Sequence, residues 1–280
     1  MINLKDEKLK IRPTIVQCGT GATGSLIVQM LSQMLASYEI DGNYLICDPD
    51  YVETKNLTNQ LFIPKDVGLP KAEVLAKRYR AAYQQKISAY TEGFVEDIET
   101  LKELFEFDYD FSNYSCYRMP ILIGAVDNNY SRQIFHEFFE QSETLLYIDV
   151  GNEGTTVPED WQERRKEEWT AEELERFNSS GYSGQVVQGL KIDGKTILEP
   201  VAAVFPDILE DKDELRPSLS CSQLIVSNPQ KLITNRFASL AVMGYLNEVF
   251  DTNSISNHIT HFHAKKGYMR SVSVPNKEDN

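Results

Sequence analysis

The chain lacks the long hydrophobic runs that membrane-spanning helices require. Its 280 residues contain no uninterrupted apolar stretch of about 18 residues, so we expect no transmembrane helix. The first residues, Met-Ile-Asn-Leu-Lys-Asp-Glu-Lys, contain no apolar core, so we expect no secretory signal peptide. Both absences favour a cytoplasmic protein with no membrane partner.

Cysteine and basic residues are also scarce. The four cysteines form no CxxC pair, which argues against a zinc ribbon and fits a reduced, cytoplasmic chain. Lys and Arg number 28 against 42 Asp and Glu, which gives a net charge of −14. Binding to nucleic acid needs clustered Lys and Arg, so we expect no nucleic-acid partner. Ordinary solubility explains the acidic balance better than electrostatic steering does.

The most informative segment that is present runs from Thr14 to Lys71. A GxGxxG motif is informative when it follows a strand, opens a helix and precedes an acidic residue at the end of the next strand. This segment contains an apolar run (14–18), GTGATG (19–24), a helical pattern (25–35) and a second apolar run (44–47) that ends on Asp48. The order and spacing predict a nucleotide-binding βαβ unit.

The glycines and the acidic residue of such a unit each have a physical purpose. Gly19 and Gly21 let the backbone turn tightly and approach a phosphate, and Gly24 lets the helix pack close to the strand. The helix N-terminus offers free N–H groups to an anion. Asp48 is placed to accept hydrogen bonds from ribose hydroxyls. The alternative is a βα turn whose glycines serve packing alone.

Strand and helix patterns alternate up to Val150, after a charged arm over residues 1–12. Strands are expected near 14–18, 43–48, 87–91, 119–125 and 144–150. Helices are expected near 22–37, 70–84, 97–106 and 128–141. This alternation predicts an α/β fold with a doubly wound, mostly parallel, Rossmann-like sheet. Ligands of such sheets bind beyond the carboxyl ends of the strands, where the glycine loop, Asp48 and Asp127 would converge.

The pattern changes after Val150. We assign residues 1–150 to a nucleotide-binding half, and 151–280 to an insertion, a crossover region and the C-terminal half of the same domain. The second half is expected to contain a polar surface excursion (151–182) with a helix near 170–177, a hairpin (184–190 and 195–198), an amphipathic helix (238–250) and C-terminal antiparallel strands (259–273).

Motifs after Asp48 separate this chain from a dehydrogenase, which should have only a short loop there. Together with the glycine loop, these motifs are DPDYVE (48–53), Asn56-Leu57, Gln60, GLPK (68–71), and Val126-Asp127-Asn128 with Arg132. On these motifs the chain resembles the ThiF/HesA/MoeB family, the adenylating domains related to ubiquitin-activating enzymes. The short ThiF-like proteins of bacterial gene clusters look most similar. The resemblance covers about residues 10–150 and continues more weakly through 217–222.

The resemblance implies an activity and its site. Family enzymes bind ATP with Mg²⁺ and join AMP to a carboxylate, usually the C-terminal glycine of a ubiquitin-like or sulfur-carrier protein or of a peptide, releasing pyrophosphate. By this resemblance Lys71 would contact phosphate, Asp127 would hold magnesium, and the cofactor-binding set would also include Asp48, Asp50, Asn56, Asn59 and Gln60. A homodimer is expected. The alternatives are a solvated residue at a helix start for Lys71 and a helix cap for Asp127.

Two departures from the family pattern stand out. The family loop commonly reads Asn-x-x-Arg-Gln, whereas this chain has Asn59 where the phosphate-contacting arginine is expected. A neutral amide cannot replace a guanidinium on phosphate. Either another cation substitutes, or catalysis is weak or lost. The candidate cations are Arg12, Lys55 or a lysine from the N-terminal arm of a dimer partner. The paired CxxC zinc ligands of many relatives are also absent.

Cys221 is the candidate for a further catalytic residue, because relatives that form a thioester use a cysteine after the adenylation sheet. The alternative is a packing residue at a helix start, since no His or Lys near it would lower its pKa. Cys18 and Cys47 end apolar runs and are expected in the core, and Cys116 is expected in a loop.

The sequence therefore favours an ATP-dependent adenylating enzyme of the ThiF type. Its first alternative is a non-catalytic nucleotide-binding or scaffold relative that kept the fold. A nicotinamide-dependent oxidoreductase is a weaker alternative. The GLPK segment argues against it, and no His–Asp pair that could act as acid and base in hydride transfer is evident.

Overall fold

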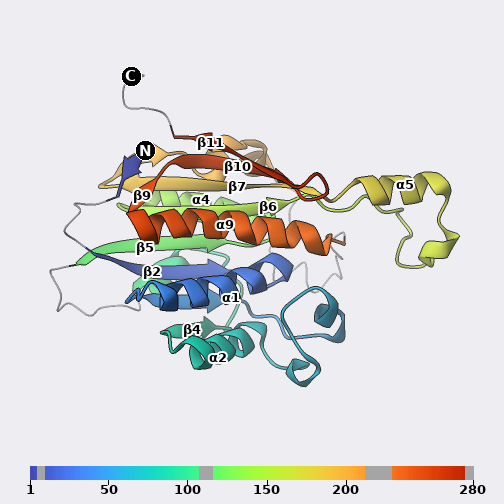
Figure 1. The fold of residues 1–280 in the computed structure, drawn as a ribbon, viewed down its shortest axis with the longest axis horizontal. Helices are drawn as coiled ribbons and strands as arrows, with labels where there is room; N and C mark the ends of the chain where they lie inside the picture. The colour runs from blue at the N-terminus through green and yellow to red at the C-terminus, as the bar shows by residue number, and fades with distance from the viewer. Residues whose placement is uncertain (5–9, 107–115, 212–228, 275–280) are drawn as a thin grey trace.

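A computed structural model describes residues 1–4, 10–106, 116–211 and 229–274. One mixed sheet runs through both halves of the chain in the order β11-β10-β7-β6-β5-β2-β3-β4 (Figure 1). Its parallel part consists of β2 (Lys10–Cys18), β3 (Asn43–Cys47), β4 (Ile87–Tyr90), β5 (Cys116–Gly124) and β6 (Leu145–Asn152).

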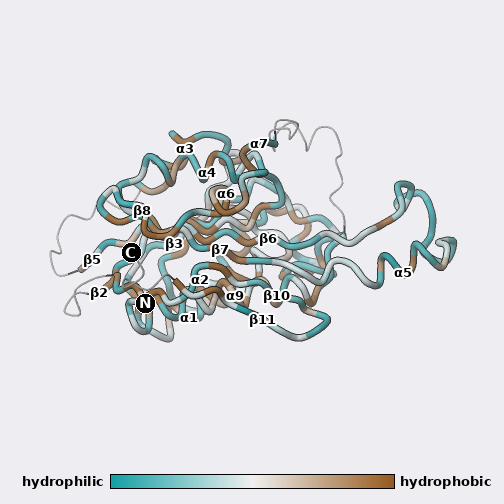
Figure 2. The backbone as a smooth tube through the Cα atoms, turned by 90° about the horizontal axis from the view of Figure 1, so that it is seen from above, coloured by the Kyte–Doolittle hydropathy of each residue, from teal (hydrophilic) through white to brown (hydrophobic). Residues whose placement is uncertain are grey.

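Helices cover both faces of this sheet, and apolar residues bury the two interfaces separately. One face packs against α1 (Ala22–Ser37), α2 (Lys71–Tyr83) and α9 (Leu232–Thr252). The other packs against α3 (Ile98–Glu106), α4 (Asn129–Gln141) and the short α6 (Val201–Val204), with α7 (Asp207–Glu210) beside α4. Figure 2 shows the two groups on opposite sides of the strands. Since both faces are covered, the carboxyl-terminal parts of the central strands are buried and mostly apolar.

The C-terminal strands are antiparallel. They are β7 (Ser183–Ile192), β8 (Lys195–Leu198), β10 (Asn257–His263) and β11 (Tyr268–Ser273), while β1 (Ile2–Asn3) pairs with β9 (Ser254–Ile255). β7 and β8 form a hairpin because Asp193 and Gly194 both adopt positive φ, 49° and 74°. The predicted α/β fold with C-terminal antiparallel strands is thus confirmed.

The excursion after β6 leaves the body of the molecule, as expected, and carries α5 (Ala171–Ser179) (Figure 1). Thr170 caps this helix: its hydroxyl accepts a hydrogen bond from the Glu173 backbone N–H at 3.2 Å, and the Glu173 carboxylate accepts one from the Thr170 N–H at 2.7 Å. Short 3-10 turns complete the fold: η1 (Thr54–Thr58), η2 (Pro64–Asp66) and η3 (Lys166–Glu168).

Two boundaries differ from the sequence-based expectation. Lys10 to Arg12 are not part of a charged arm, since β2 already begins at Lys10 and pairs there with Cys116 of β5. Ile11 is buried, which explains why the strand extends this far, and Cys116 is a strand residue rather than a loop residue. Helix α9 begins six residues earlier than expected. Within the described residues, no helix combines the length and apolarity needed to cross a membrane.

Candidate functional site

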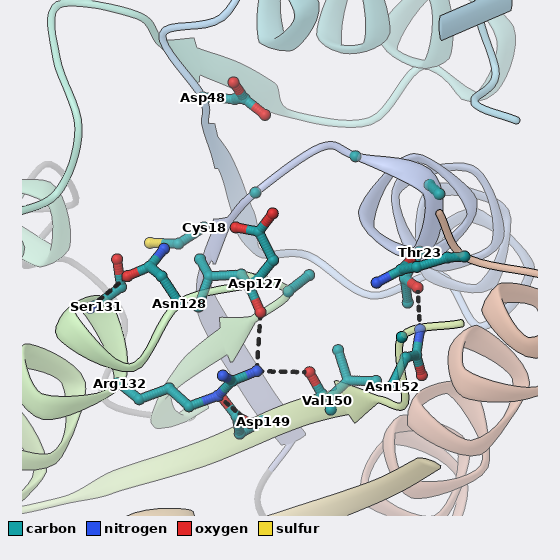
Figure 3. Close-up of a pocket in the computed structure, with 18 of the residues that line it drawn as sticks. Cys18, Thr23, Asp48, Asp127, Asn128, Ser131, Arg132, Asp149, Val150 and Asn152 are labelled. Carbon is teal, nitrogen blue, oxygen red and sulfur yellow. Dashed lines mark hydrogen bonds and ion pairs between the residues drawn. The ribbon is translucent and has the colours of Figure 1, made fainter. Parts of the chain in front are cut away.

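A cavity of about 1330 Å³ opens at the carboxyl ends of the parallel strands. Most of the predicted site residues line it, namely Gly19, Gly21, Asp48, Asp50, Asn56, Asn59, Gln60, Lys71 and Asp127. They come from the loops after β2, β3 and β5 and from the start of α2, so the topology of the sheet brings them together. Figure 3 shows Asp48 and Asp127 facing the same space from different strands.

The glycine loop joins β2 to α1 at the edge of this cavity. Gly19 has φ +94°, which disfavours other residues, and a Cβ at Gly21 would meet nothing within 4 Å, so the backbone there is open to a ligand. The side-chain amide of Gln17 donates to the carbonyls of Gly19 and Gly24 at 2.9 and 3.0 Å and fixes the loop from behind. Gly24 packs against the loop and does not line the cavity.

Asp48 is buried at the end of β3 and is tied to the glycine loop. Its Oδ2 accepts hydrogen bonds from the N–H and the hydroxyl of Thr20 at 2.8 and 2.6 Å, and its Oδ1 accepts one from the Asp50 N–H at 2.9 Å. Burial raises the pKa of Asp48, and the Lys71 ammonium together with the Thr20 hydrogen bond offsets part of that rise. The carboxylate therefore shapes the loop. Oδ2 already accepts two hydrogen bonds, so Oδ1 is the oxygen that keeps a lone pair for a ribose hydroxyl.

Lys71 is the first residue of α2 and is only 7% exposed. Its Nζ donates to the Asp50 carboxylate at 2.8 Å, and the Asp50 side chain is 44% exposed. The alternative of a solvated lysine at a helix start is therefore wrong. The ammonium is held at the cavity wall with part of its charge balanced by Asp50.

The polar loop after β3 presents amides to the cavity. The Asn56 carboxamide oxygen accepts a hydrogen bond from the Glu53 N–H at 2.8 Å, so this side chain also caps η1. The side-chain oxygens of Asn59 and Gln60 are buried and have no hydrogen-bond partner among the described residues. Lys55 lines the cavity as well, with its Nζ 3.0 Å from the exposed Glu53 carboxylate. Unsatisfied buried acceptors favour a ligand that donates hydrogen bonds.

Asp127 lies between β5 and α4 with its side chain exposed in the cavity. The N-cap of α4 is Asn128, whose side chain accepts a hydrogen bond from the Ser131 N–H at 2.8 Å. The helix-cap alternative for Asp127 is therefore wrong, and its carboxylate is left to a ligand. Among the described residues, no group of three or more His, Cys, Asp or Glu could hold a metal ion by itself.

Arg132 and Asp149 form a buried ion pair below Asp127 (Figure 3). The Arg132 Nε donates to Asp149 at 3.0 Å, and Nη2 donates to the carbonyls of Val126 and Val150 at 2.8 and 3.2 Å. Burial would lower the pKa of Arg132, but the Asp149 carboxylate more than offsets this effect, so the net change is upward. The guanidinium thus holds two backbone segments together: Val126, which directly precedes Asp127, and Val150 near the end of β6.

A second polar group was not predicted from the sequence. The Asn152 amide donates to the Thr23 hydroxyl and to the Asn235 carboxamide oxygen, both at 2.9 Å, and the Thr23 hydroxyl donates to that oxygen at 3.0 Å. These residues come from β6, α1 and α9, and Figure 3 shows the Asn152–Thr23 contact. Because these contacts join residues more than 80 positions apart, no local sequence pattern predicts them.

One predicted catalytic residue, Arg12, is not brought to this cavity. Arg12 lies six residues before the end of β2, which is roughly 20 Å along the strand. Its Nε is 3.8 Å from Asp41, which precedes β3 at the amino ends of the strands. Arg12 therefore does not serve the cavity of its own chain. Cys221 lies outside the described residues. Cys18 and Cys47 are buried in the core, as expected.

Comparisons with known proteins bear on the family and the fold. The model of the ThiF family matches residues 5–280. The mouse protein "Ubiquitin-like modifier-activating enzyme 7" is 41% identical over 119 residues, which cover 41% of this chain and only 11% of the mouse protein.

Two solved structures share the fold. E. coli MccB, crystallised with AMPCPP and MccA, has a TM-score of 0.59 at 15% identity, over 96% of this chain and 66% of MccB. PaaA has a TM-score of 0.57 at 14% identity, over 94% of this chain and 73% of PaaA. The family model spans nearly the whole chain, and both structures have the same architecture. The chain belongs to the ThiF family.

Proposed function

We propose that this protein is an ATP-dependent adenylating enzyme that activates the C-terminal carboxylate of a ubiquitin-like or sulfur-carrier protein, or of a peptide that ends in glycine. The observation that carries the proposal is the convergence of the open glycine loop, the Lys71 ammonium and the exposed Asp127 carboxylate on one cavity. Family membership and the MccB structure with AMPCPP and MccA support the same class of reaction.

In the proposed reaction, a substrate carboxylate oxygen forms a bond to the α-phosphorus of ATP. The bond from that phosphorus to the oxygen that bridges to the β-phosphorus breaks, and pyrophosphate leaves with the electron pair. The carboxylate is already ionised, so no base has to remove a proton. The barrier arises from charge crowding, which N–H groups at the start of α1 and the Lys71 ammonium would reduce.

The residues around Asp127 fit a magnesium ion bound together with nucleotide phosphates. Its carboxylate is exposed in the cavity and forms no salt bridge with a described residue. Mg²⁺ commonly takes one or two carboxylates plus phosphate oxygens, so the lack of a larger acidic cluster is no obstacle. A bound ion would neutralise part of the phosphate charge.

The buried amide oxygens of Asn59 and Gln60 fit the sugar better than the phosphates. An amide oxygen accepts hydrogen bonds, and ribose hydroxyls donate them, whereas phosphate oxygens do not. We therefore place the ribose between these amides and Asp48, with the phosphates directed toward Gly21 and Lys71.

A non-catalytic relative is the second candidate, and one observation favours it. Lys71 is already paired with Asp50, and Asn59 provides no guanidinium, so the cavity has little free positive charge for a triphosphate. Such a protein would bind a nucleotide weakly and form no adenylate.

ATP–pyrophosphate exchange separates these candidates. The assay would combine the protein with Mg²⁺, ATP, labelled pyrophosphate and peptides that end in glycine, with the Asp127→Ala variant as the control. Thermal unfolding with Mg-ATP should give a higher midpoint than with no ligand, because binding to the native state stabilises it. NAD should give no increase. Stabilisation by NAD and none by ATP would refute the proposal, and ATP binding without exchange for any substrate would favour the scaffold.

A further inference from the structure

Three lysines gather on two aromatic rings beside the excursion. The Nζ atoms of Lys166 and Lys231 lie 4.1 and 3.5 Å from the centroid of the Phe177 ring. Lys231 is also 5.5 Å from the Tyr182 ring, and the Lys265 Nζ is 5.2 Å from that ring. We call these three lysines and two rings the lysine cluster.

The lysine cluster lies next to residues that line the cavity. Lys231 directly follows Gln230, and Tyr182 directly precedes Ser183, and both of these neighbours line the cavity. The three lysines come from separate segments, which are the excursion, the residue before α9 and the turn between β10 and β11. Figure 1 shows these segments at the same end of the molecule. A molecule entering the cavity from this side would pass the lysine cluster.

The positive charge of this cluster is not balanced locally. Lys166 and Lys231 approach the same ring, so their ammonium nitrogens lie within about 8 Å of each other and repel. Burial lowers the pKa of Lys231, and the ammonium groups of Lys166 and Lys265 lower it further. None of the three lysines forms a salt bridge with a carboxylate in the described residues.

Two acidic residues of α5 are engaged elsewhere. Glu173 of α5 binds Arg164 at 2.8 Å, and Glu172 binds Arg176 at 2.5 Å. The Lys265 Nζ donates to the backbone carbonyl of Asn178 at 3.1 Å, which positions it without neutralising it. Glu172 and Glu173 of α5 therefore pair with arginines, while the lysines are held by rings and a carbonyl.

A purely structural explanation is that the lysines fasten the excursion through cation–π contacts. One such contact would suffice for that purpose, and the convergence of three like charges opposes it. The arrangement is also unusual for a chain of net charge −14, which repels acidic molecules at long range. A local cationic cluster next to the cavity compensates for that repulsion where a substrate must enter.

We propose that the lysine cluster binds an acidic segment of the peptide or small protein whose C-terminus enters the cavity. The inference rests on the proposed function for the identity of the substrate as a polypeptide carboxylate. It adds that carboxylate side chains upstream of the C-terminus are recognised, so the enzyme prefers acidic substrates over neutral ones.

The test compares two fluorescent peptides that both end in Gly-Gly. One carries four Asp or Glu residues upstream, and the other carries Asn or Gln at the same positions. Fluorescence anisotropy without ATP should show at least about tenfold tighter binding of the acidic peptide at low salt, and the preference should shrink as salt screens the exposed charges. The preference should disappear in the K166Q/K231Q/K265Q variant.

A matched variant controls for overall charge. K65Q/K77Q/K195Q removes three exposed lysines that do not line the cavity, and it should keep the preference. The K166R/K231R/K265R variant keeps the three positive charges and should also keep the preference for the acidic peptide. This variant therefore shows whether the Gln variant loses the preference through loss of charge or through detachment of the excursion. Equal affinity of the unaltered protein for the two peptides would overturn the inference. So would an equal loss of the preference in the K65Q/K77Q/K195Q control.

The outcome is independent of the adenylation proposal. Selective binding of the acidic peptide without ATP binding would support the lysine cluster and refute the enzyme. Pyrophosphate exchange at equal rates with acidic and neutral peptides would support the enzyme and refute the lysine cluster.

Discussion

Replacing Arg132 with methionine would remove the guanidinium that pairs with Asp149 while keeping most of the apolar stem. Asp149 is only 2% exposed, and without Arg132 it would keep the Tyr147 hydroxyl at 2.9 Å as its remaining side-chain partner in the described residues. The carbonyls of Val126 and Val150 would lose their donor as well. Breaking a buried ion pair from one side leaves an uncompensated charge and costs about 3–5 kcal/mol.

Chemical denaturation should show this loss as a lower free energy of unfolding. In a domain of this size about 1 kcal/mol corresponds to roughly 2–4 °C, so the midpoint of thermal unfolding should fall by roughly 6–20 °C. Asn at position 149 should also destabilise, because it leaves the guanidinium buried without a carboxylate. The double variant R132M/D149N should lose less than the sum of the two single variants, since neither charge then remains unpaired.

A loss below about 1 kcal/mol for R132M, or strictly additive losses in the double variant, would refute the reasoning. The pair also holds the backbone next to Asp127, so R132M should weaken Mg-ATP binding at a temperature where the variant is fully folded. Tyr147→Phe is the matched control. It removes one hydrogen bond to Asp149 but leaves the ion pair and the Val126 contact in place.

Three further outcomes are expected. Asp127→Ala should abolish pyrophosphate exchange and leave the unfolding midpoint within about 1 °C, because the side chain is exposed and caps no helix; unchanged exchange would remove Asp127 from the magnesium site. Asn59→Arg should raise exchange several-fold, because the longer arginine side chain can extend past the ribose position and form a bidentate phosphate contact. Asn59→Leu should lower exchange, and an Asn59→Arg rate no higher than that of the unaltered protein would show that no cation is missing. Light scattering at micromolar concentration should report a two-fold homodimer, and a monomer would contradict it.

The sequence predicted most of the fold because the parallel strands are apolar runs separated by helical patterns. It placed the start of α9 late because the first turns of this helix break the amphipathic pattern. Leu232 and Ile233 are exposed there, whereas Thr234 and Asn235 are fully buried and bonded to other segments. Such a reversal cannot be read from periodicity, since it depends on hydrogen bonds to residues far along the chain.

The position of the cavity was predictable for a similar reason. Asp48, Asp127 and the glycine loop each follow a parallel strand, and topology places the ends of parallel strands at one edge. The charge pairing inside the cavity was not predictable. Lys71 and Asp50 lie 21 positions apart, and nothing in their spacing shows that the lysine donates to this carboxylate rather than pointing freely at a phosphate.

The pairing of charges also bears on the missing loop arginine. Within the described residues, the cations that line the cavity are Lys55, Lys71 and Arg132, and each already faces a carboxylate. The Arg132 pair is buried and would be costly to break. Lys71 is buried, although its partner is partly exposed. Lys55 is 73% exposed and pairs with a Glu53 side chain that is 59% exposed. Exposed pairs of this kind contribute little to stability, so Lys55 can exchange its partner for a phosphate at small cost. Of the cations in this cavity, Lys55 therefore has the greatest freedom to take over the contact that Asn59 cannot make.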